Sequence, residues 1–201
     1  MSPDLASLAA PPPQLDEVAA GSFSAAALRA WQIVAPLPID STRLPRPPGW
    51  WSRRKLARAQ IALAHCLQLA PAAPMALWGM GRLLFAKGDP QGAHGFLQRA
   101  LDGAPHQPQL ALELSHLAAT LGDLQGAERW ARRVVDQVPD DAAAMVHYIE
   151  SLVAAGHLKR ALGVAVNHLR RHPEDHAAQR VLQHVRAHID ASPTDSADPQ
   201  R

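Results

Sequence analysis

The chain has 201 residues, of which 47% are hydrophobic and 4% aromatic, and its formal net charge is +2. This length fits one domain of ordinary size, and the single cysteine, Cys66, excludes an internal disulfide bond. No apolar run approaches the roughly 18 residues that a membrane span needs, and we find no secretory signal at the N-terminus. We therefore expect a cytoplasmic protein. The bias toward Ala, Arg and Pro favours a GC-rich bacterial genome.

The N-terminal part is predicted as a flexible segment, residues 1–21, followed by a helix and a proline-rich strap at residues 22–54. The helix is expected at 23–34, where apolar residues recur at helical spacing. These residues are Leu28, Trp31 and Val34. The strap contains prolines that cannot lie inside a helix. They are Pro45, Pro47 and Pro48.

The rest of the chain repeats with a period of 34 residues. The residues that keep this spacing are prolines (Pro71, Pro105, Pro139, Pro173), alanines (Ala59, Ala93, Ala127, Ala161) and glycines (Gly88, Gly122, Gly156). A period held by three residue types is typical of stacked helical hairpins. The sequence therefore predicts an array of such hairpins.

Residues 74–107 show what one period contains. A first apolar stripe ends at the Gly-Asp-Pro turn of residues 88–90, where glycine can take the left-handed position after a helix and proline can open the next one. A second helix follows and ends before Pro105. The small residues Gly81 and Ala93 fall where the two helices are expected to approach most closely, and larger side chains there would force them apart.

The pattern resembles the tetratricopeptide repeat family, whose units carry a small residue on the first helix, two alanines on the second and a proline after it. The residues at these positions are Gly81, Ala93, Ala100 and Pro105 in 74–107, Ser115, Ala127, Val134 and Pro139 in 108–141, and Ile149, Ala161, His168 and Pro173 in 142–175. The resemblance covers about residues 55–190. It implies an all-α fold, a right-handed α-solenoid of about three helical hairpins.

Both ends depart from the full repeat. Residues 55–70 match a second helix, but the prolines in 40–53 exclude its partner, so this is half a repeat and we expect the helix at 23–34 to stand in. Alternatively, that helix folds back into the binding groove as an autoinhibitory plug. Residues 176–189 predict a closing helix that covers the last apolar face, and the polar tail 191–201 is expected to be disordered.

The third unit also departs from the pattern. Ile149 stands where a small residue is expected and should widen that helix pair, and His168 replaces a packing alanine. Asp175 is the predicted N-cap of the closing helix.

The resemblance implies a concave groove lined by the first helices of successive repeats. Its predicted lining is Met75, Trp78, Arg82, Phe85, Leu112, His116, Val146, Glu150 and Val153. A largely apolar stripe of this kind usually marks a binding site when it is exposed, and it suits an amphipathic helix or an extended hydrophobic peptide of another protein. Alternatively, Trp78 and Phe85 pack against the N-terminal helix and strap. The family's carboxylate clamp for chaperone peptides is absent, because its positions hold Trp78, Arg82, Glu113, Ala143 and His147.

A second candidate surface is basic and aromatic. It consists of Trp50, Trp51, Arg53, Arg54, Lys55 and Arg58. Four interpretations of this surface stay open. It is either a solvated face, a docking surface for an acidic protein or a membrane-surface contact, or it is a nucleic-acid site in which tryptophan stacks on bases and arginine holds phosphates.

Eleven histidines raise the question of a metal site. His184 and His188 are four residues apart, which places two imidazoles on one helix face, but no H-E-x-x-H signature accompanies them. We expect no metal and no cofactor. Phosphate-binding loops and catalytic motifs are absent, and Glu113 and Glu150 are expected on helix surfaces, so we predict no enzyme.

These features predict a non-catalytic scaffold or adaptor that binds a protein segment in the groove. The alternatives are a client-specific, secretion-type chaperone for a hydrophobic protein, nucleic-acid association through Trp50–Arg58, and a regulatory subunit of an enzyme encoded elsewhere. Pairing of two copies through the end helices stays open.

Overall fold

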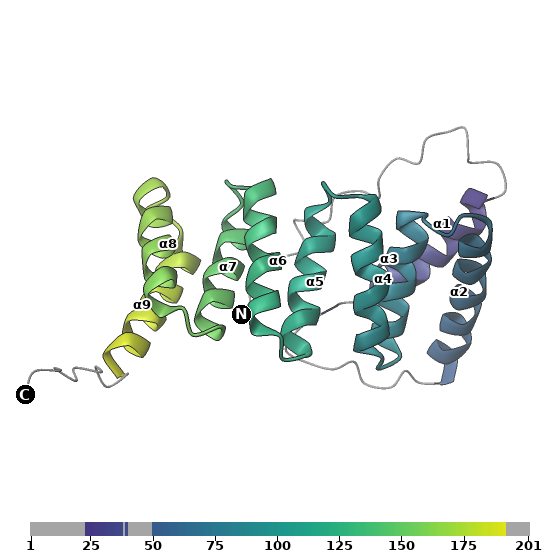
Figure 1. Ribbon diagram of the computed structural model, residues 1–201, viewed down its shortest axis with the longest axis horizontal. Helices are drawn as coiled ribbons and strands as arrows, with labels where there is room; N and C mark the ends of the chain where they lie inside the picture. Colours follow the sequence, from purple (N-terminus) through teal and green to yellow (C-terminus); the bar gives the residue numbers. More distant parts are fainter. Residues whose placement is uncertain (1–22, 38, 40–49, 192–201) are drawn as a thin grey trace, which may run out of the picture.

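The computed structural model describes residues 23–37, 39 and 50–191, and in these ranges all regular structure is helical (Figure 1). The helices are α1 (Phe23–Val34), α2 (Trp50–Leu69), α3 (Pro74–Ala86), α4 (Pro90–Gly103), α5 (Pro108–Thr120), α6 (Leu124–Gln137), α7 (Ala142–Ala154), α8 (Leu158–Arg171) and α9 (His176–Ala191). The predicted all-α array of hairpins is confirmed. The N-terminal segment 1–21, most of the strap and the tail lie outside the described residues.

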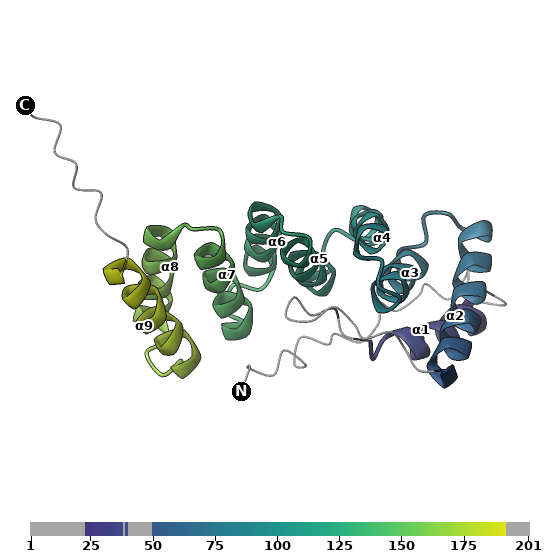
Figure 2. The same ribbon diagram turned by 90° about the horizontal axis from the view of Figure 1, so that it is seen from below.

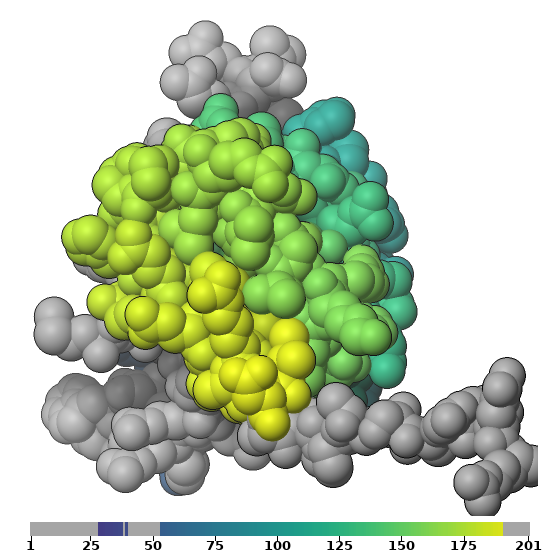
Figure 3. All heavy atoms as spheres, turned by 90° about the vertical axis from the view of Figure 1, so that its left-hand side faces the viewer, coloured from purple at the N-terminus to yellow at the C-terminus, as the bar shows by residue number. Residues whose placement is uncertain are grey.

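The array has two layers. Helices α3, α5 and α7 lie along one side, which we call the inner face, and α4, α6 and α8 lie along the other (Figure 2). Helix α1 lies on the side of α3 and packs against both α2 and α3. At the other end, α9 packs against α7 and α8, and Figure 3 views the molecule from this end.

The turn inside each hairpin depends on a glycine and, in two of three cases, an aspartate. Gly88, Gly122 and Gly156 all have positive φ, between 81° and 86°, which a residue with a Cβ adopts only with strain. Asp89 then accepts a hydrogen bond from the Gly92 amide at 2.8 Å, which satisfies one of the free amides at the start of α4. Asp123 does the same for α6.

The two helices of the first hairpin meet at Gly81. A Cβ there would lie 2.7 Å from both Cγ and Cδ2 of Leu97, and Leu97 is fully buried. The predicted close approach is therefore confirmed for this hairpin. Ile149 occupies the corresponding place in the third hairpin, and α7 and α8 pack less closely than α3 and α4 do, as its size predicts.

The outer layer carries a periodic contact that the sequence analysis missed. Arg99 donates a hydrogen bond to the Pro71 carbonyl at 3.0 Å, and Arg133 donates to the Pro105 carbonyl at 3.1 Å. The second pair follows the first by one repeat along the chain. Each arginine also lies over an aromatic ring of its own helix. These arginines satisfy carbonyl groups in the turns between hairpins, which would otherwise have to be paired by water.

The start of the closing helix is fixed by Asp175. One of its carboxylate oxygens accepts hydrogen bonds from the Ala177 and Ala178 amides, and the other lies 2.8 Å from His168 Nε2. Burial alone would raise the pKa of Asp175, but these amides and the imidazole together hold it below its usual value. His168, which replaces a packing alanine, is thus buried with a polar partner.

Two matched glycine substitutions test the close approach. We expect Gly95→Ala to raise the free energy of unfolding by about 0.5–1 kcal/mol, because alanine is the better helix former and nothing lies within 4 Å of the added methyl group. Gly81→Ala should lower it, because an overpacking cost of about 1–3 kcal/mol exceeds the same gain. Urea denaturation followed by circular dichroism measures both changes, and equal stabilisation by the two variants would contradict the contact with Leu97.

Candidate functional site

The nine predicted groove residues all lie on α3, α5 and α7, but most are covered. Those buried are Met75, Trp78, Phe85, Leu112 and Val146. Arg82, His116 and Val153 are partly buried, and Glu150 is exposed. In this arrangement a partner cannot reach the tryptophan and phenylalanine of α3 without a rearrangement of the chain.

Helix α1 covers the α3 section of the inner face. The ring of Trp31 meets the ring of Trp78 edge-on, with centroids 4.8 Å apart, and both rings are buried. The Arg82 guanidinium lies over both rings, 5.6 Å and 5.7 Å from their centroids, and its Nη1 donates a hydrogen bond to the Ala35 carbonyl. Of the alternative in which Trp78 and Phe85 pack against the N-terminal helix and strap, this structure shows the contact of Trp78 with the helix.

The carboxylate of Glu113 organises this section. Its Oε2 accepts a hydrogen bond from Trp78 Nε1 at 2.8 Å, and its Oε1 accepts from Arg82 Nε at 2.9 Å. Arg82 Nη2 also donates to Oε1, at 2.5 Å. The expectation that Glu113 lies on a helix surface is wrong, since only 2% of the residue is exposed. The sequence contains one signal of this ion pair: Glu113 follows Arg82 by about one repeat, and both lie on first helices.

Between α5 and α7 the inner face carries a histidine pair. The rings of His116 and His147 lie with centroids 4.5 Å apart. Ser115 donates its hydroxyl proton to the Ala127 carbonyl at 2.8 Å, so its oxygen can only accept from His147 Nε2, 2.9 Å away. Burial, and then the neighbouring His116, lower the pKa of His147 from 6.5 to about 3. His147 is therefore neutral, with its proton on Nε2.

This Ser–His contact does not have the geometry of a catalytic pair. A nucleophilic serine must give its proton to the imidazole, whereas the hydroxyl of Ser115 points its proton at a backbone carbonyl. Ser115 is also fully buried, so no substrate reaches it. The contact instead ties α5 to α7.

Farther along α7 the inner face is open. Glu150 is exposed, and its pKa is raised by partial desolvation, against an opposing effect of His184 on α9. Val153 lies one turn beyond it and is half-buried. We call the surface formed by His116, Glu150, Val153 and Ala154 the open section. It presents one carboxylate and one imidazole beside the apolar side chains of Val153 and Ala154.

The basic surface of α2 is exposed at four of its predicted residues. These are Arg53, Arg54, Lys55 and Arg58. Trp50 and Trp51 begin α2, so this helix starts before the predicted Lys55, directly after the last proline and glycine of the strap. The tryptophan side chains lie outside the described residues.

In the part of the chain that the structure describes, no group of three or more His, Cys, Asp and Glu side chains could hold a metal ion. The histidine pair His184 and His188 has ring centroids 4.2 Å apart on α9. Cys66 is buried, and burial raises its pKa. Among the described residues, no helix has the length and apolar character to cross a membrane.

Known proteins resemble this chain in sequence pattern and in fold. Two family models described as tetratricopeptide repeat match residues 84–144 and 51–108. No curated protein matches the sequence. The solved structure of YrrB, titled a TPR protein with an unusual peptide-binding site, superposes with a TM-score of 0.59 at 21% identity, over 71% of this chain and 74% of YrrB. The structure titled APC/C hetero-tetramer Cut9-Hcn1 superposes with a TM-score of 0.51 at 18% identity, over 67% of this chain and 27% of the matched chain.

The buried ion pair yields a stability prediction. We expect Glu113→Gln to lower the free energy of unfolding by roughly 3–5 kcal/mol, because it leaves a largely buried arginine without its counter-charge. The control Asp136→Asn breaks the exposed pair with Arg132 and should change it by less than about 0.5 kcal/mol. Urea denaturation at neutral pH measures both. If both variants changed the free energy of unfolding by the same small amount, the Glu113 carboxylate would not be needed to stabilise the buried Arg82.

The lowered pKa of His147 yields a pH prediction. Between pH 6.5 and about 3 the unfolded chain binds a proton at this residue that the folded chain rejects, so stability should fall as the pH drops below 6.5. At pH 5 the loss is at most about 2 kcal/mol, and less because the imidazole keeps some contact with water. His147→Gln retains a donor for Ser115 and cannot titrate. Urea denaturation at pH 7 and pH 5 should therefore show a smaller loss for this variant than for the wild type, and identical losses would rule out the neutral His147.

Proposed function

Because the chain is a tetratricopeptide repeat protein, we propose that it is a non-catalytic scaffold that binds a segment of another protein on its inner face. The observation that carries the proposal is the open section, where Glu150 and Ala154 are exposed one turn apart on α7 while the α3 section is closed by α1. Helical repeat arrays build extended binding surfaces from such faces.

The open section favours a partner of particular chemistry. The exposed carboxylate of Glu150 fits a lysine or arginine, and its raised pKa means that a cation would restore part of the stabilisation that desolvation removes. Val153 and Ala154 offer a small apolar surface beside it. A peptide or helix with a basic residue next to a short apolar side chain satisfies both features.

The comparisons support the class of function and not the partner. YrrB is described as having an unusual peptide-binding site, and a peptide on the inner face of this chain is proposed by analogy of fold alone. The chaperone alternative depended on an exposed apolar stripe, and burial of five of its residues weakens that support. The alternative of nucleic-acid association through α2 is supported only by the exposure of four basic residues, Arg53, Arg54, Lys55 and Arg58.

A charge reversal on the open section tests the proposal. We expect the double variant Glu150→Lys/Ala154→Arg to lose a partner that the wild-type chain captures from native lysate, because it repels a basic residue and fills the space beside it. Both residues are exposed, so the fold should be unaffected. Quantitative mass spectrometry of the captured proteins measures the loss.

The control places a similar charge reversal on the outer layer. Asp136→Lys changes an exposed residue of α6 and should retain the partner. A partner kept by both variants would exclude the open section as the binding site. Loss in both variants would point to net charge and not to a specific surface.

A further inference from the structure

We propose that α1 is an intramolecular ligand, packed on α2 and α3 and seated against a preformed pocket that also takes an amphipathic helix of another protein with the same anchoring groups. This inference rests on the proposed function, because it identifies a second partner-binding section of the inner face. The pocket is defined by Trp78, Arg82 and Glu113.

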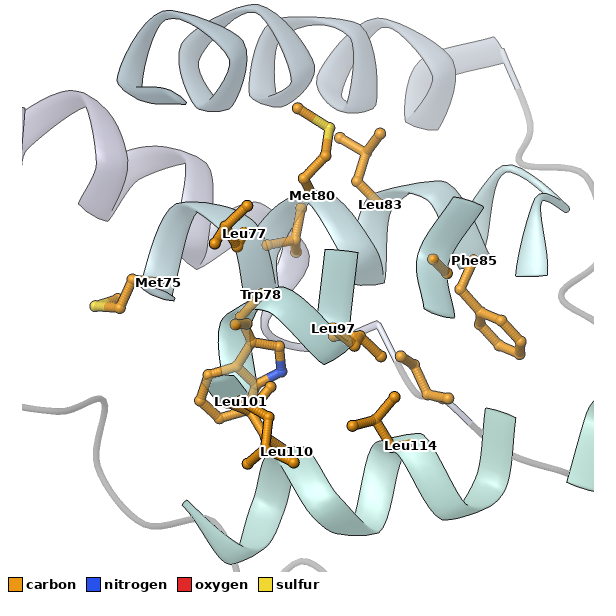
Figure 4. Packing of buried hydrophobic residues seen from close by; sticks show 14 of the residues in the cluster. Met75, Leu77, Trp78, Met80, Leu83, Phe85, Leu97, Leu101, Leu110 and Leu114 are labelled. Atoms are coloured by element: carbon orange, nitrogen blue, oxygen red, sulfur yellow. The ribbon is translucent and has the colours of Figure 1, made fainter. Parts of the chain in front are cut away.

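The three residues of the pocket are bonded to one another without help from α1. All hydrogen bonds among its three residues run between α3 and α5: Trp78 Nε1 and Arg82 Nε both donate to Glu113. Figure 4 shows the Trp78 indole packed beside Leu101 and Leu110, which belong to the array itself. A departing α1 would therefore leave the aromatic ring and the guanidinium in place.

What α1 supplies is a helix end with one aromatic anchor. The Ala35 carbonyl, directly after α1, accepts a hydrogen bond from Arg82 Nη1, and a cation is favoured there because the last carbonyl groups of a helix are unpaired and carry partial negative charge. Trp31 lies one turn earlier on the same face, against Trp78 and Arg82. Val34, fully buried, fills the space beside Gly79.

The way in which α1 is joined to the array differs from that of every other described helix. Helices α3 and α4 are separated by residues 87–89, whereas α1 and α2 are separated by residues 35–49. The outward face of α1 is open, with Leu28 45% exposed and Gln32 exposed. A partner helix therefore competes with a segment of the same chain, whose effective concentration at the pocket falls as the connection to the array lengthens.

The pocket thus selects its partner by chemistry that α1 already displays. A competing helix must end over Arg82 with a free backbone carbonyl and must carry tryptophan or a similar aromatic residue one turn earlier. A lysine or arginine in its last turn would be repelled by the Arg82 guanidinium. Tryptophan is also among the residues that most often anchor protein interfaces.

A peptide probe tests this directly on the full chain. The probe is a fluorescein-labelled peptide of residues 23–37, and the control peptide carries Trp31→Ala. Three proteins are compared by fluorescence anisotropy: the wild type, Trp31→Ala, and Trp130→Ala, which removes a half-buried tryptophan of the outer layer. We expect the probe to bind the Trp31→Ala chain at least tenfold more tightly than the other two, and the control peptide to bind none of them.

Two results would overturn the inference. One is equal or absent binding of the probe to all three chains while circular dichroism shows the Trp31→Ala array folded. The other combines two observations. The Trp31→Ala chain is unfolded throughout, and in the wild type the amides of α1 exchange with solvent no faster than those of α3. Together they would make α1 part of the core. Exchange of the α1 amides at least tenfold faster than those of α3 supports a detachable helix.

A third result that would overturn the inference is exchange of α1 between two copies of the chain. If wild-type α1 occupied the pocket of a neighbouring molecule, light scattering would show a dimer, and the intramolecular seat would be wrong. Failure of the peptide test leaves the open section of α7 untouched, because neither Glu150 nor Ala154 contributes to the pocket. The two proposals therefore fail separately.

Discussion

Every hairpin of this array depends on how closely its two helices approach. In the first hairpin the absence of a side chain at Gly81 lets Leu97 pack directly on α3, and Ser115 serves the second hairpin with a buried hydroxyl that bonds to the Ala127 carbonyl. With Ile149 in the third, α7 and α8 separate. That looser pair includes the helix of the open section, so the size of one side chain in each repeat decides how far apart the helices of its hairpin lie.

The buried ion pair adds a constraint that the repeat pattern does not contain. Arg82 and Glu113 join α3 to α5, and the same guanidinium also holds the end of α1. A buried ion pair is weak support for stability compared with apolar packing, but breaking it is costly. It therefore fixes which surfaces meet at the N-terminal end of the array more than it strengthens the fold.

Sequence predicted the repeat, its turns and its caps because these depend on local chemistry: positive φ at Gly88, a side-chain acceptor at Asp175, a small residue at Gly81. It could not predict the state of the inner face, since a groove residue and a covered residue have the same helical position. Trp78 illustrates this, because only the position of α1, which no period encodes, decides whether its ring meets a partner or Trp31. The buried Glu113 was missed for the same reason: its partner lies on another repeat.

The two sections of the inner face impose different costs on a partner. A partner that binds beside Glu150 meets a surface that is already exposed, so its binding free energy is not reduced by the displacement of a helix. One that enters the Trp78 pocket must first remove α1, and its apparent affinity is reduced by the fraction of chains in which the pocket is empty. Under the proposed displacement, a weak helix is therefore rejected at α3 although it presents the right groups. Selectivity at that end arises from competition with α1 as much as from contact with the pocket.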